Sequence, residues 1–210
     1  MTSHPVGRVP AGPVPTGLVA ILRGVTPAEA VAVAEAVFEA GFDAVEVPFN
    51  SPDPLESIRR IRAACPAGRR VGAGTVLTPD DVRRAADAGA SLIVSPNTRA
   101  DVVAETVRLG LESYPGAATP TEAFAALDAG ARAIKLFPST AVGIDGMRAW
   151  ASVLPPGTGL VPVGGVDATN LADWARAGAS GAGVGTSLYR PGDAPETVAA
   201  RATRLVEIWR

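Results

Sequence analysis

A short unit recurs along this chain: an amphipathic, helix-like stretch, then a glycine, then a run of apolar residues. It is present in the segments EAGFDAVEVPF, DAGASLIVSPN, RLGLESYPG, DAGARAIKLFP and RAGASGAGVG. A glycine in this place is typical of the left-handed residue that ends a helix, and the β-branched run after it is typical of a buried strand. The unit therefore predicts strands that alternate with helices, with helix-ending glycines at Gly41, Gly89, Gly110, Gly130 and Gly178.

The apolar runs predict eight strands, each followed by a helix-like stretch. They lie near residues 18–22, 43–48, 70–74, 91–95, 111–115, 132–137, 159–163 and 181–184. Strands that alternate with helices pair in parallel through right-handed crossovers. We therefore expect an α/β fold, a (β/α)8 TIM barrel, as one domain over residues 17–210. An open doubly wound sheet is the alternative, and no shift in composition indicates a domain boundary.

Helix starts carry signals of their own. A hydroxyl side chain at the N-cap accepts a hydrogen bond from the first turn, and proline is favoured at the first helical position. These signals predict helix caps at Thr26-Pro27, Ser51-Pro52, Thr78-Pro79 and Thr169.

The first residues, 1–16, are rich in proline and glycine, which predicts a flexible arm. They hold no apolar region typical of a secretory signal, and no apolar run in the chain is long enough to span a bilayer. Cys65 is the single cysteine, which excludes an intramolecular disulfide and is typical of a reducing compartment. We therefore expect a cytoplasmic location and no membrane partner.

The net charge and the histidine content argue against several classes of function. The formal net charge is −2, so nothing indicates a nucleic-acid partner, and arginines such as Arg59, Arg60 and Arg62 are typical of a solvated helix face. The only histidine is His4, within the predicted arm. Serine–histidine triads, cysteine–histidine pairs and zinc sites with histidine ligands are therefore not expected. We expect no metal and no cofactor.

In a (β/α)8 barrel the functional residues lie at the carboxyl ends of the strands and in the loops that follow them. Glycine-rich turns follow the seventh and eighth predicted strands, at Gly164-Gly165 and Gly185-Thr186. Backbone N–H groups in such turns approach an anion closely, so these turns predict a phosphate site. The other strand ends carry Arg23-Gly24, Glu46, Gly74-Thr75, Ser95-Pro96-Asn97, Pro115-Gly116 and Lys135.

Lys135, in AIKLFPST, is the only lysine among 19 cationic side chains, and it stands in an apolar run. A lysine amine can lose its proton and attack a carbonyl, which a guanidinium does not do. Its ordinary pKa is near ~10.4, and desolvation can lower it towards ~7–8. The position therefore predicts a nucleophilic amine. The alternative is a lysine whose charge is balanced by a buried acid, without chemistry.

Glu46, in the apolar strand DAVEVPF, is the acid that could lie near Lys135. An unpaired carboxylate in such a strand is costly, so the position indicates a function or a partner. Both strands project into one barrel mouth, where Glu46 could move protons to and from a Schiff base on Lys135. A plain structural Glu–Lys pair is the alternative.

These residues stand in motifs that resemble the 2-keto-3-deoxy-6-phosphogluconate/6-phosphogalactonate aldolase family, from about Gly17 to the C-terminus. The motifs are ILRGVTPAEA, GFDAVEVPFNSP, GAGTVLTPDDV, IVSPN, YPGAATPTEA, AIKLFPSTAVG and VPVGGV. The resemblance implies a trimeric class I aldolase that needs no metal and splits a phosphorylated 2-keto-3-deoxy sugar acid into pyruvate and D-glyceraldehyde 3-phosphate.

The resemblance also implies a role for each matching residue. Lys135 would form the imine, and Glu46 would be the general acid and base. Arg23 and Thr75 would bind the substrate carboxylate. Phe137 would pack beside the imine, and the phosphate would bind at Gly164, Gly165, Gly185 and Thr186.

Local differences favour the galactonate branch of that family as the substrate preference. Asn50 stands where the gluconate branch carries an arginine, and Arg23 would supply the cation instead. Val163 precedes the double glycine where the gluconate branch has a threonine that can bond a sugar hydroxyl. We place Asn50, Val163, Phe137 and Pro96 in the substrate pocket. Thr186-Ser187 departs from the Ser-Asp more common in the galactonate branch, which leaves only a backbone contact expected there.

Four alternatives stay open at this point. The chain could prefer the gluconate epimer, or it could be a phosphosugar isomerase or epimerase with Glu46 as base. It could be an inactive barrel that only binds a partner, in which case the strand-end groups would be scattered. Finally, the chain could be a metal-dependent aldolase, whose activity a chelator would reduce.

Overall fold

The computed structural model describes residues 17–210, so the arm predicted for residues 1–16 and His4 lie outside the described residues. The strands are β1 (Gly17–Ile21), β2 (Ala44–Pro48), β3 (Arg70–Gly74), β4 (Leu92–Val94), β5 (Glu112–Tyr114), β6 (Gly116–Ala117), β7 (Ala133–Leu136), β8 (Gly159–Pro162) and β9 (Gly181–Val184). The helices are α1 (Ala30–Ala40), α2 (Pro54–Ala64), α3 (Pro79–Asp87), α4 (Ala100–Arg108), α5 (Pro120–Asp128), α6 (Ser139–Ala151), α7 (Leu171–Arg176) and α8 (Pro195–Trp209).

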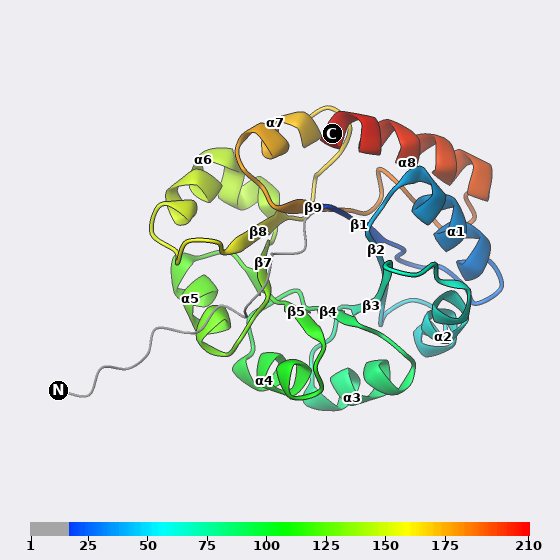
Figure 1. Ribbon diagram of the computed structural model, residues 1–210, viewed down its shortest axis with the longest axis horizontal. Helices are drawn as coiled ribbons and strands as arrows, with labels where there is room; N and C mark the ends of the chain where they lie inside the picture. The colour runs from blue at the N-terminus through cyan, green and yellow to red at the C-terminus, as the bar shows by residue number, and fades with distance from the viewer. Residues whose placement is uncertain (1–16) are drawn as a thin grey trace.

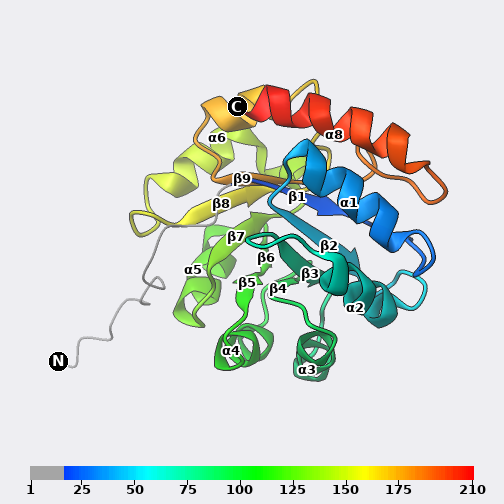
Figure 2. The same ribbon diagram turned by 45° about the vertical axis from the view of Figure 1, so that its right-hand side comes forward.

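The strands pair in parallel, as the alternation predicts, and form two sheets. One has the order β5-β4-β3-β2-β1-β9 and the other the order β6-β7-β8. A parallel bridge between Val163 and Gly183 joins the end of β8 to β9. Figures 1 and 2 show the strands around a common centre with the helices outside them, and α8 beside α1, where β9 pairs with β1. The fold is therefore a curled parallel sheet covered by helices on its outer side.

The predicted strand near 111–115 is two short strands, β5 and β6, which is a correction to the sequence analysis. Pro115 separates them and has no backbone N–H to donate to a neighbouring strand. Its carbonyl still accepts from the N–H of Lys135 at 3.0 Å, so the break stays local. The other predicted strands match the observed ones to within a residue or two at each end.

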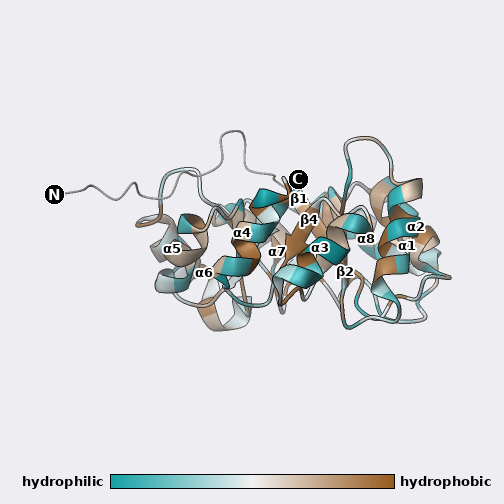
Figure 3. Cartoon of the chain, turned by 90° about the horizontal axis from the view of Figure 1, so that it is seen from below, coloured by the Kyte–Doolittle hydropathy of each residue, from teal (hydrophilic) through white to brown (hydrophobic). Residues whose placement is uncertain are grey.

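Each strand has two buried faces, which explains why the strands read as apolar throughout. On β1, Leu18 and Ala20 pack outwards against the helices, while Val19 and Ile21 face the interior. The interior cluster comprises Val19, Ile21, Ala44, Leu92, Val94, Tyr114, Ala133, Val161 and Val163. In Figure 3 the strands β1 and β4 are coloured hydrophobic, and helices such as α3 carry a hydrophilic face.

Only one of the four predicted helix caps is correct. Thr78 accepts from the N–H of Asp81 at 3.1 Å and caps α3. The caps predicted at Thr26, Ser51 and Thr169 are wrong, because α1, α2 and α7 begin later, after Glu29, Asp53 and Asn170. Their polar groups bond within loops, as when the hydroxyl of Ser51 accepts from the N–H of Gly24 at 2.9 Å. A hydroxyl beside a loop backbone has more than one possible donor, and local sequence does not choose between them.

The same Thr-Pro signal occurs at Thr119-Pro120, where sequence analysis predicted no cap. Thr119 accepts from the N–H of Glu122 at 3.3 Å, and the Glu122 carboxylate accepts from the N–H of Thr119 at 2.9 Å. This is a capping box at the start of α5. The helix-ending glycines are confirmed, since Gly41, Gly89, Gly110, Gly130 and Gly178 all have φ between 72° and 113°.

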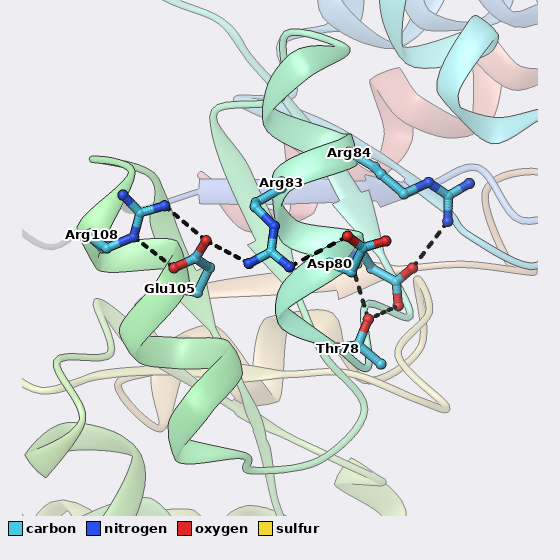
Figure 4. A network of polar contacts seen from close by, with 7 residues as sticks. Thr78, Asp80, Arg83, Arg84, Glu105 and Arg108 are labelled. Carbon is cyan, nitrogen blue, oxygen red and sulfur yellow. Dashed lines mark hydrogen bonds and ion pairs between the residues drawn. The ribbon is translucent and has the colours of Figure 1, made fainter.

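The arginines of α2, α3 and α4 lie on solvated faces, as their pattern indicates. Arg59 and Arg60 pair with Glu56 on α2. Arg83 of α3 donates to Glu105 of α4 at 3.0 Å, and Glu105 also accepts from Arg108, so that these arginines lower the pKa of Glu105 to about 2. Figure 4 shows this chain of contacts across the two helices. Exposed pairs of this kind contribute at most about 1 kcal/mol each.

Within residues 17–210, no helix combines the length and apolar character needed to cross a membrane.

Candidate active site

A cavity of about 340 Å³ opens at the carboxyl ends of the strands. It lies between the ends of β1, β2, β7, β8 and β9 and the loops that follow them. Most of the residues that sequence analysis selected line this one cavity: Arg23, Glu46, Phe137, Lys135, Val163, Gly164, Gly165, Gly185 and Thr186. The scattering expected of an inactive barrel is therefore not observed for these groups.

Three selected residues do not line the cavity. Asn50 lies beside it, where its side-chain oxygen accepts from Nη1 of Arg23 at 2.5 Å. Thr75 directly follows Gly74 at the end of β3 and has φ of 57°, a left-handed backbone that is uncommon for threonine. The carbonyl of Pro96 packs against Gly116, where an added Cβ would lie 2.3 Å from it. Asn50 therefore reaches the cavity only through Arg23.

Lys135 is the third residue of β7 and is only 7% exposed. It pairs in register with Gly116 on one side and Val161 on the other, which leaves apolar groups around its stem. Burial lowers the pKa of the Lys135 amine, the Glu46 carboxylate opposes that change, and the Arg23 guanidinium adds to it. The Nζ atom lies 4.5 Å from the centre of the Phe137 ring. The desolvation that a nucleophilic amine requires is therefore present.

Glu46 is the third residue of β2 and is 2% exposed. Burial raises the pKa of its carboxyl to about 7, against the opposing charges of Lys135 and Arg23. Its Oε2 atom has no hydrogen-bond partner among residues 17–210. Glu46 and Lys135 thus influence each other's pKa without a direct ion pair between them in the described chain, so the structural-pair alternative is not supported.

Room for the Glu46 carboxylate comes from a glycine on the neighbouring strand. A Cβ added at Gly74 would lie 1.7 Å from Oε2 of Glu46, far inside contact distance. Glycine is therefore needed at this position of β3 because the Glu46 carboxylate lies so close to its backbone. Its φ is not left-handed, so the backbone conformation does not require glycine. Sequence analysis placed Gly74 at a strand end without assigning it this purpose.

We expect Gly74→Ala to displace the Glu46 carboxylate, because the added methyl group and the carboxylate would occupy the same space. Overpacking of this kind costs about 1–3 kcal/mol in the free energy of unfolding. Urea denaturation measures that loss. Repeating Gly74→Ala in a Glu46→Ala background is the matched control, because the carboxylate is then gone. An equal loss in both backgrounds would show that the carboxylate is not what Gly74 accommodates.

The turn after β8 presents two successive left-handed residues, Gly164 with φ of 92° and Gly165 with φ of 77°. The Ser139 hydroxyl donates to the carbonyl of Gly164 at 2.6 Å, and the Asn170 amide donates to the carbonyl of Gly165 at 2.7 Å. An added Cβ at Gly165 would lie 2.5 Å from Cγ2 of Thr140. With both carbonyls engaged, the turn can offer its N–H groups to an anion.

The turn after β9 completes this end of the cavity with Gly185, Thr186 and Ser187. The hydroxyl of Ser187 donates to the carbonyl of Val166 at 2.8 Å, so it holds two loops together. Arg190 donates through Nε to the carbonyl of Thr186 at 3.3 Å. Because the Ser187 hydroxyl already has a partner, a backbone contact to an anion is the simpler one here, as the sequence predicts.

Several residues of this cavity were missed by sequence reasoning. Ile21, Val166, Asp167 and Gly183 also line it. Each lies within two residues of a selected position, so a wider window around the strand ends would have found them. Ser139, which is buried and supports the Gly164 turn, stands directly after the cis peptide between Phe137 and Pro138. No pattern in the sequence marked it.

In residues 17–210 no group of three or more histidine, cysteine, aspartate or glutamate side chains is placed to hold a metal ion.

Comparison with known proteins places the chain among aldolases. The family model described as "Aldolase: KDPG and KHG aldolase" matches residues 15–200. The 2-dehydro-3-deoxy-6-phosphogalactonate aldolase of Escherichia coli is 48% identical over 193 residues, which is 92% of this chain and 94% of that protein. A 2-dehydro-3-deoxy-phosphogluconate aldolase of Treponema pallidum is 36% identical over 148 residues, 70% of this chain and 69% of that one. The solved structure of native KDPGal superposes with a TM-score of 0.89 at 45% identity, covering 100% of this chain and 96% of that one.

Proposed function

The chain belongs to the KDPG and KHG aldolase family and is an aldolase, and we propose that it cleaves 2-dehydro-3-deoxy-6-phosphogalactonate into pyruvate and D-glyceraldehyde 3-phosphate by class I chemistry. One observation carries the mechanism. The only lysine of the chain is buried in the cavity with a lowered pKa, beside a carboxyl whose pKa is raised to about 7.

The reaction begins at the amine of Lys135. Its unprotonated nitrogen attacks the C2 carbonyl of the substrate, and loss of water from the resulting carbinolamine gives a protonated imine. The imine withdraws electrons, so that loss of the proton from the C4 hydroxyl breaks the C3–C4 bond and leaves an enamine. The aldehyde departs. Protonation of the enamine at C3 and hydrolysis of the imine then release pyruvate and the free amine.

Glu46 is the group that moves protons in these steps. With a pKa of about 7 it is present in both protonation states near neutral pH, which suits a residue that must donate and accept in one cycle. Glu46 lines the cavity, and its buried Oε2 atom has no hydrogen-bond partner within residues 17–210. The proximity of Lys135 favours this assignment over a purely structural one.

The two ends of the cavity suit the two charged ends of the substrate. We assign the carboxylate to Arg23, whose guanidinium is oriented by Asn50, with Thr75 at the same edge of the sheet. We assign the phosphate to the turns Gly164-Gly165 and Gly185-Thr186. Phe137 and Val163 line the wall beside Lys135, and Pro96 is assigned to the pocket from the family resemblance alone.

The choice of epimer rests on Val163 and on the relatives. Val163 offers only an apolar surface to the cavity, so a sugar hydroxyl gains no hydrogen bond there. The relatives with 48% and 46% identity are a 2-dehydro-3-deoxy-6-phosphogalactonate aldolase and a probable one. We therefore assign the galactonate epimer as the preferred substrate, with weaker activity on the gluconate epimer.

Pyruvate release from the two epimers tests this assignment. In a lactate dehydrogenase-coupled assay we expect kcat/KM to be higher for the galactonate epimer. An apolar wall such as Val163 rejects a sugar hydroxyl only weakly, so we expect the two kcat/KM values to differ by about 10²-fold at most. Release of no pyruvate from either epimer would contradict the aldolase and support the isomerase alternative. A higher kcat/KM for the gluconate epimer would contradict only the substrate, and unchanged rates with a chelator would argue against the metal-dependent alternative.

We propose that residues 17–210 form one domain with a closed (β/α)8 barrel. Beyond the Val163–Gly183 bridge, the N–H of Arg132 donates to the carbonyl of Ser113 at 2.9 Å, which links the β7 side to β5. A trimer is also proposed. A cage designed by fusing symmetric oligomeric domains contains a chain 48% identical to this one, with a TM-score of 0.89, and 71% of that chain is covered. Light scattering after size exclusion would measure the number of chains. Cytoplasmic location stays a prediction from the single cysteine.

A further inference from the structure

The side chain of Tyr114 on β5 contacts two regions of the protein interior: the small cavity beside Lys135 and a polar cluster around Arg70. Its side chain lines a small apolar cavity of about 10 Å³ together with Glu46 and Lys135. Its hydroxyl accepts from Nη1 of Arg70 at 3.0 Å and donates to Oε2 of Glu112 at 3.3 Å. The residue is only 3% exposed. One rigid side chain therefore extends from the reacting pair to a second polar cluster.

That second cluster lies at the other end of the strands. Arg70 and Glu112 are the first residues of β3 and β5, whereas the 340 Å³ cavity opens at the carboxyl ends. Nη1 of Arg70 lies 2.9 Å from Oε2 of Glu112, and both side chains are largely buried. Burial raises the pKa of Tyr114 to about 12, so its hydroxyl stays protonated and keeps both contacts. The aldolase chemistry uses none of these three groups.

The space between the two ends is filled by apolar side chains. Val19, Val94 and Val161 line the small cavity around the Tyr114 ring, within the interior cluster. Within residues 17–210, four charged or titratable residues line a cavity together with Lys135: Glu46 from β2, Arg23 after β1, Tyr114 from β5 and Asp167 after β8. Of these, the charges of Glu46 and Arg23 act on the Lys135 pKa. In the small cavity itself, Val161 of β8, Val163 directly after β8 and Gly183 of β9 add no charge.

We infer that Tyr114 is a positioning residue: held at its hydroxyl by Arg70 and Glu112, its ring closes the interior beneath Lys135 and Glu46 and excludes water from that side. The proposal rests on the proposed function only in taking Lys135 and Glu46 as the reacting groups. Burial is the leading cause of the pKa changes at both of them, so whatever keeps water out also sets their protonation. The small cavity has room for about one water molecule at most.

The protonation of Lys135 can be read directly and without substrate. Because the chain has a single lysine, incorporation of lysine labelled with ¹³C at Cε gives one signal whose shift reports the charge of the amine. We expect Tyr114→Ala to raise the midpoint of that titration by at least about one pH unit, since water then reaches the amine. A one-unit rise lowers the neutral fraction at pH 7 about tenfold, and the rate of borohydride trapping with pyruvate should fall by the same factor. Tyr114→Phe, which keeps the ring, should shift the midpoint less.

Phe38→Ala is the matched control. Phe38 is a buried aromatic residue of α1 in the outer cluster, so its loss removes similar volume away from Lys135. We expect a similar loss of thermal stability with no shift of the Lys135 midpoint. An unchanged midpoint in folded Tyr114→Ala, or an equal shift in Phe38→Ala, would overturn the proposal. If Tyr114→Ala does not fold, Tyr114→Leu carries the same test with a smaller expected shift. Failure of wild-type trapping would count against the aldolase, and the NMR midpoint remains readable in that case.

Discussion

Lys135→Arg is expected to lower kcat/KM by at least about 10⁴-fold, the scale on which enzymes respond to loss of a covalent nucleophile. Arginine preserves the positive charge beside Glu46, yet a guanidinium does not form an imine with a ketone under these conditions. The variant should also lose the adduct that borohydride fixes in the presence of pyruvate. Intact mass and peptide mapping measure the adduct. In the wild-type chain we expect one reduced pyruvyl group on the peptide that contains Lys135.

This experiment has little ambiguity because the chain supplies few amines. Only the N-terminal amine competes with Lys135, and peptide mapping separates the two. Lys135→Met is the companion variant, since it removes the charge as well as the nucleophile. Retention of more than a tenth of wild-type activity in Lys135→Arg, or a folded wild-type protein that stays unmodified, would refute the imine mechanism. The phosphosugar isomerase would then become the leading hypothesis.

Glu46→Gln is expected to lower kcat by about 10²–10⁴-fold, the usual contribution of a general acid or base. The amide occupies nearly the same space above Gly74, so the fold should be retained. The wild-type pH profile of kcat should bend near pH 7, where Glu46 changes protonation, and the bend should disappear in Glu46→Gln. A bend that persists in the variant would assign the pKa near 7 to another group.

The same variant gives an independent reading of the Glu46 pKa through stability. The folded-state pKa of about 7 lies above the ordinary value of 4.5, so the folded protein binds the extra proton between these two pH values. Glu46 therefore contributes stability that is fully present below pH 4.5 and is lost as the pH rises through 7. Relative to Glu46→Gln, the wild-type free energy of unfolding should fall by about 3 kcal/mol across that window. A difference that stays flat would show that burial does not raise this pKa.

Much of the fold follows from local patterns that the chain repeats. A buried parallel strand must be apolar on both faces, and a helix that ends at a left-handed residue favours glycine, so both leave a strong signal. The break between β5 and β6 has a local cause, Pro115, which is visible in the sequence. Sequence analysis nevertheless predicted one strand there, because it relied on the apolar run. Three of the four predicted helix caps were wrong for a different reason. The Ser51 hydroxyl bonds to Gly24, which is 27 residues away, and no local rule foresees such a partner.

In the candidate site, too, some features could be predicted from the sequence and others could not. The sequence alone indicated three features of the site: a single lysine in one apolar strand, a glutamate in another, and a double glycine at a strand end. Burial of a lysine or a glutamate is costly without a partner or a function, so these positions stand out in the sequence. Asn50 shows the limit. Its place in the sequence suggested a wall of the pocket, whereas its side chain contacts Arg23 outside the cavity.

What the sequence determined by itself is the order of strands and helices and the family, and it also supplied Lys135 and Glu46 as the reacting residues that we propose. The tertiary structure decided how those residues are tuned. Lys135 and Glu46 stand 89 positions apart, and the room for the Glu46 carboxylate comes from Gly74 on a third element. Tyr114, Arg70 and Glu112 likewise meet only because β3 and β5 lie on either side of β4. Desolvation and close packing depend on neighbours brought together by folding, and for that reason no local pattern encodes them.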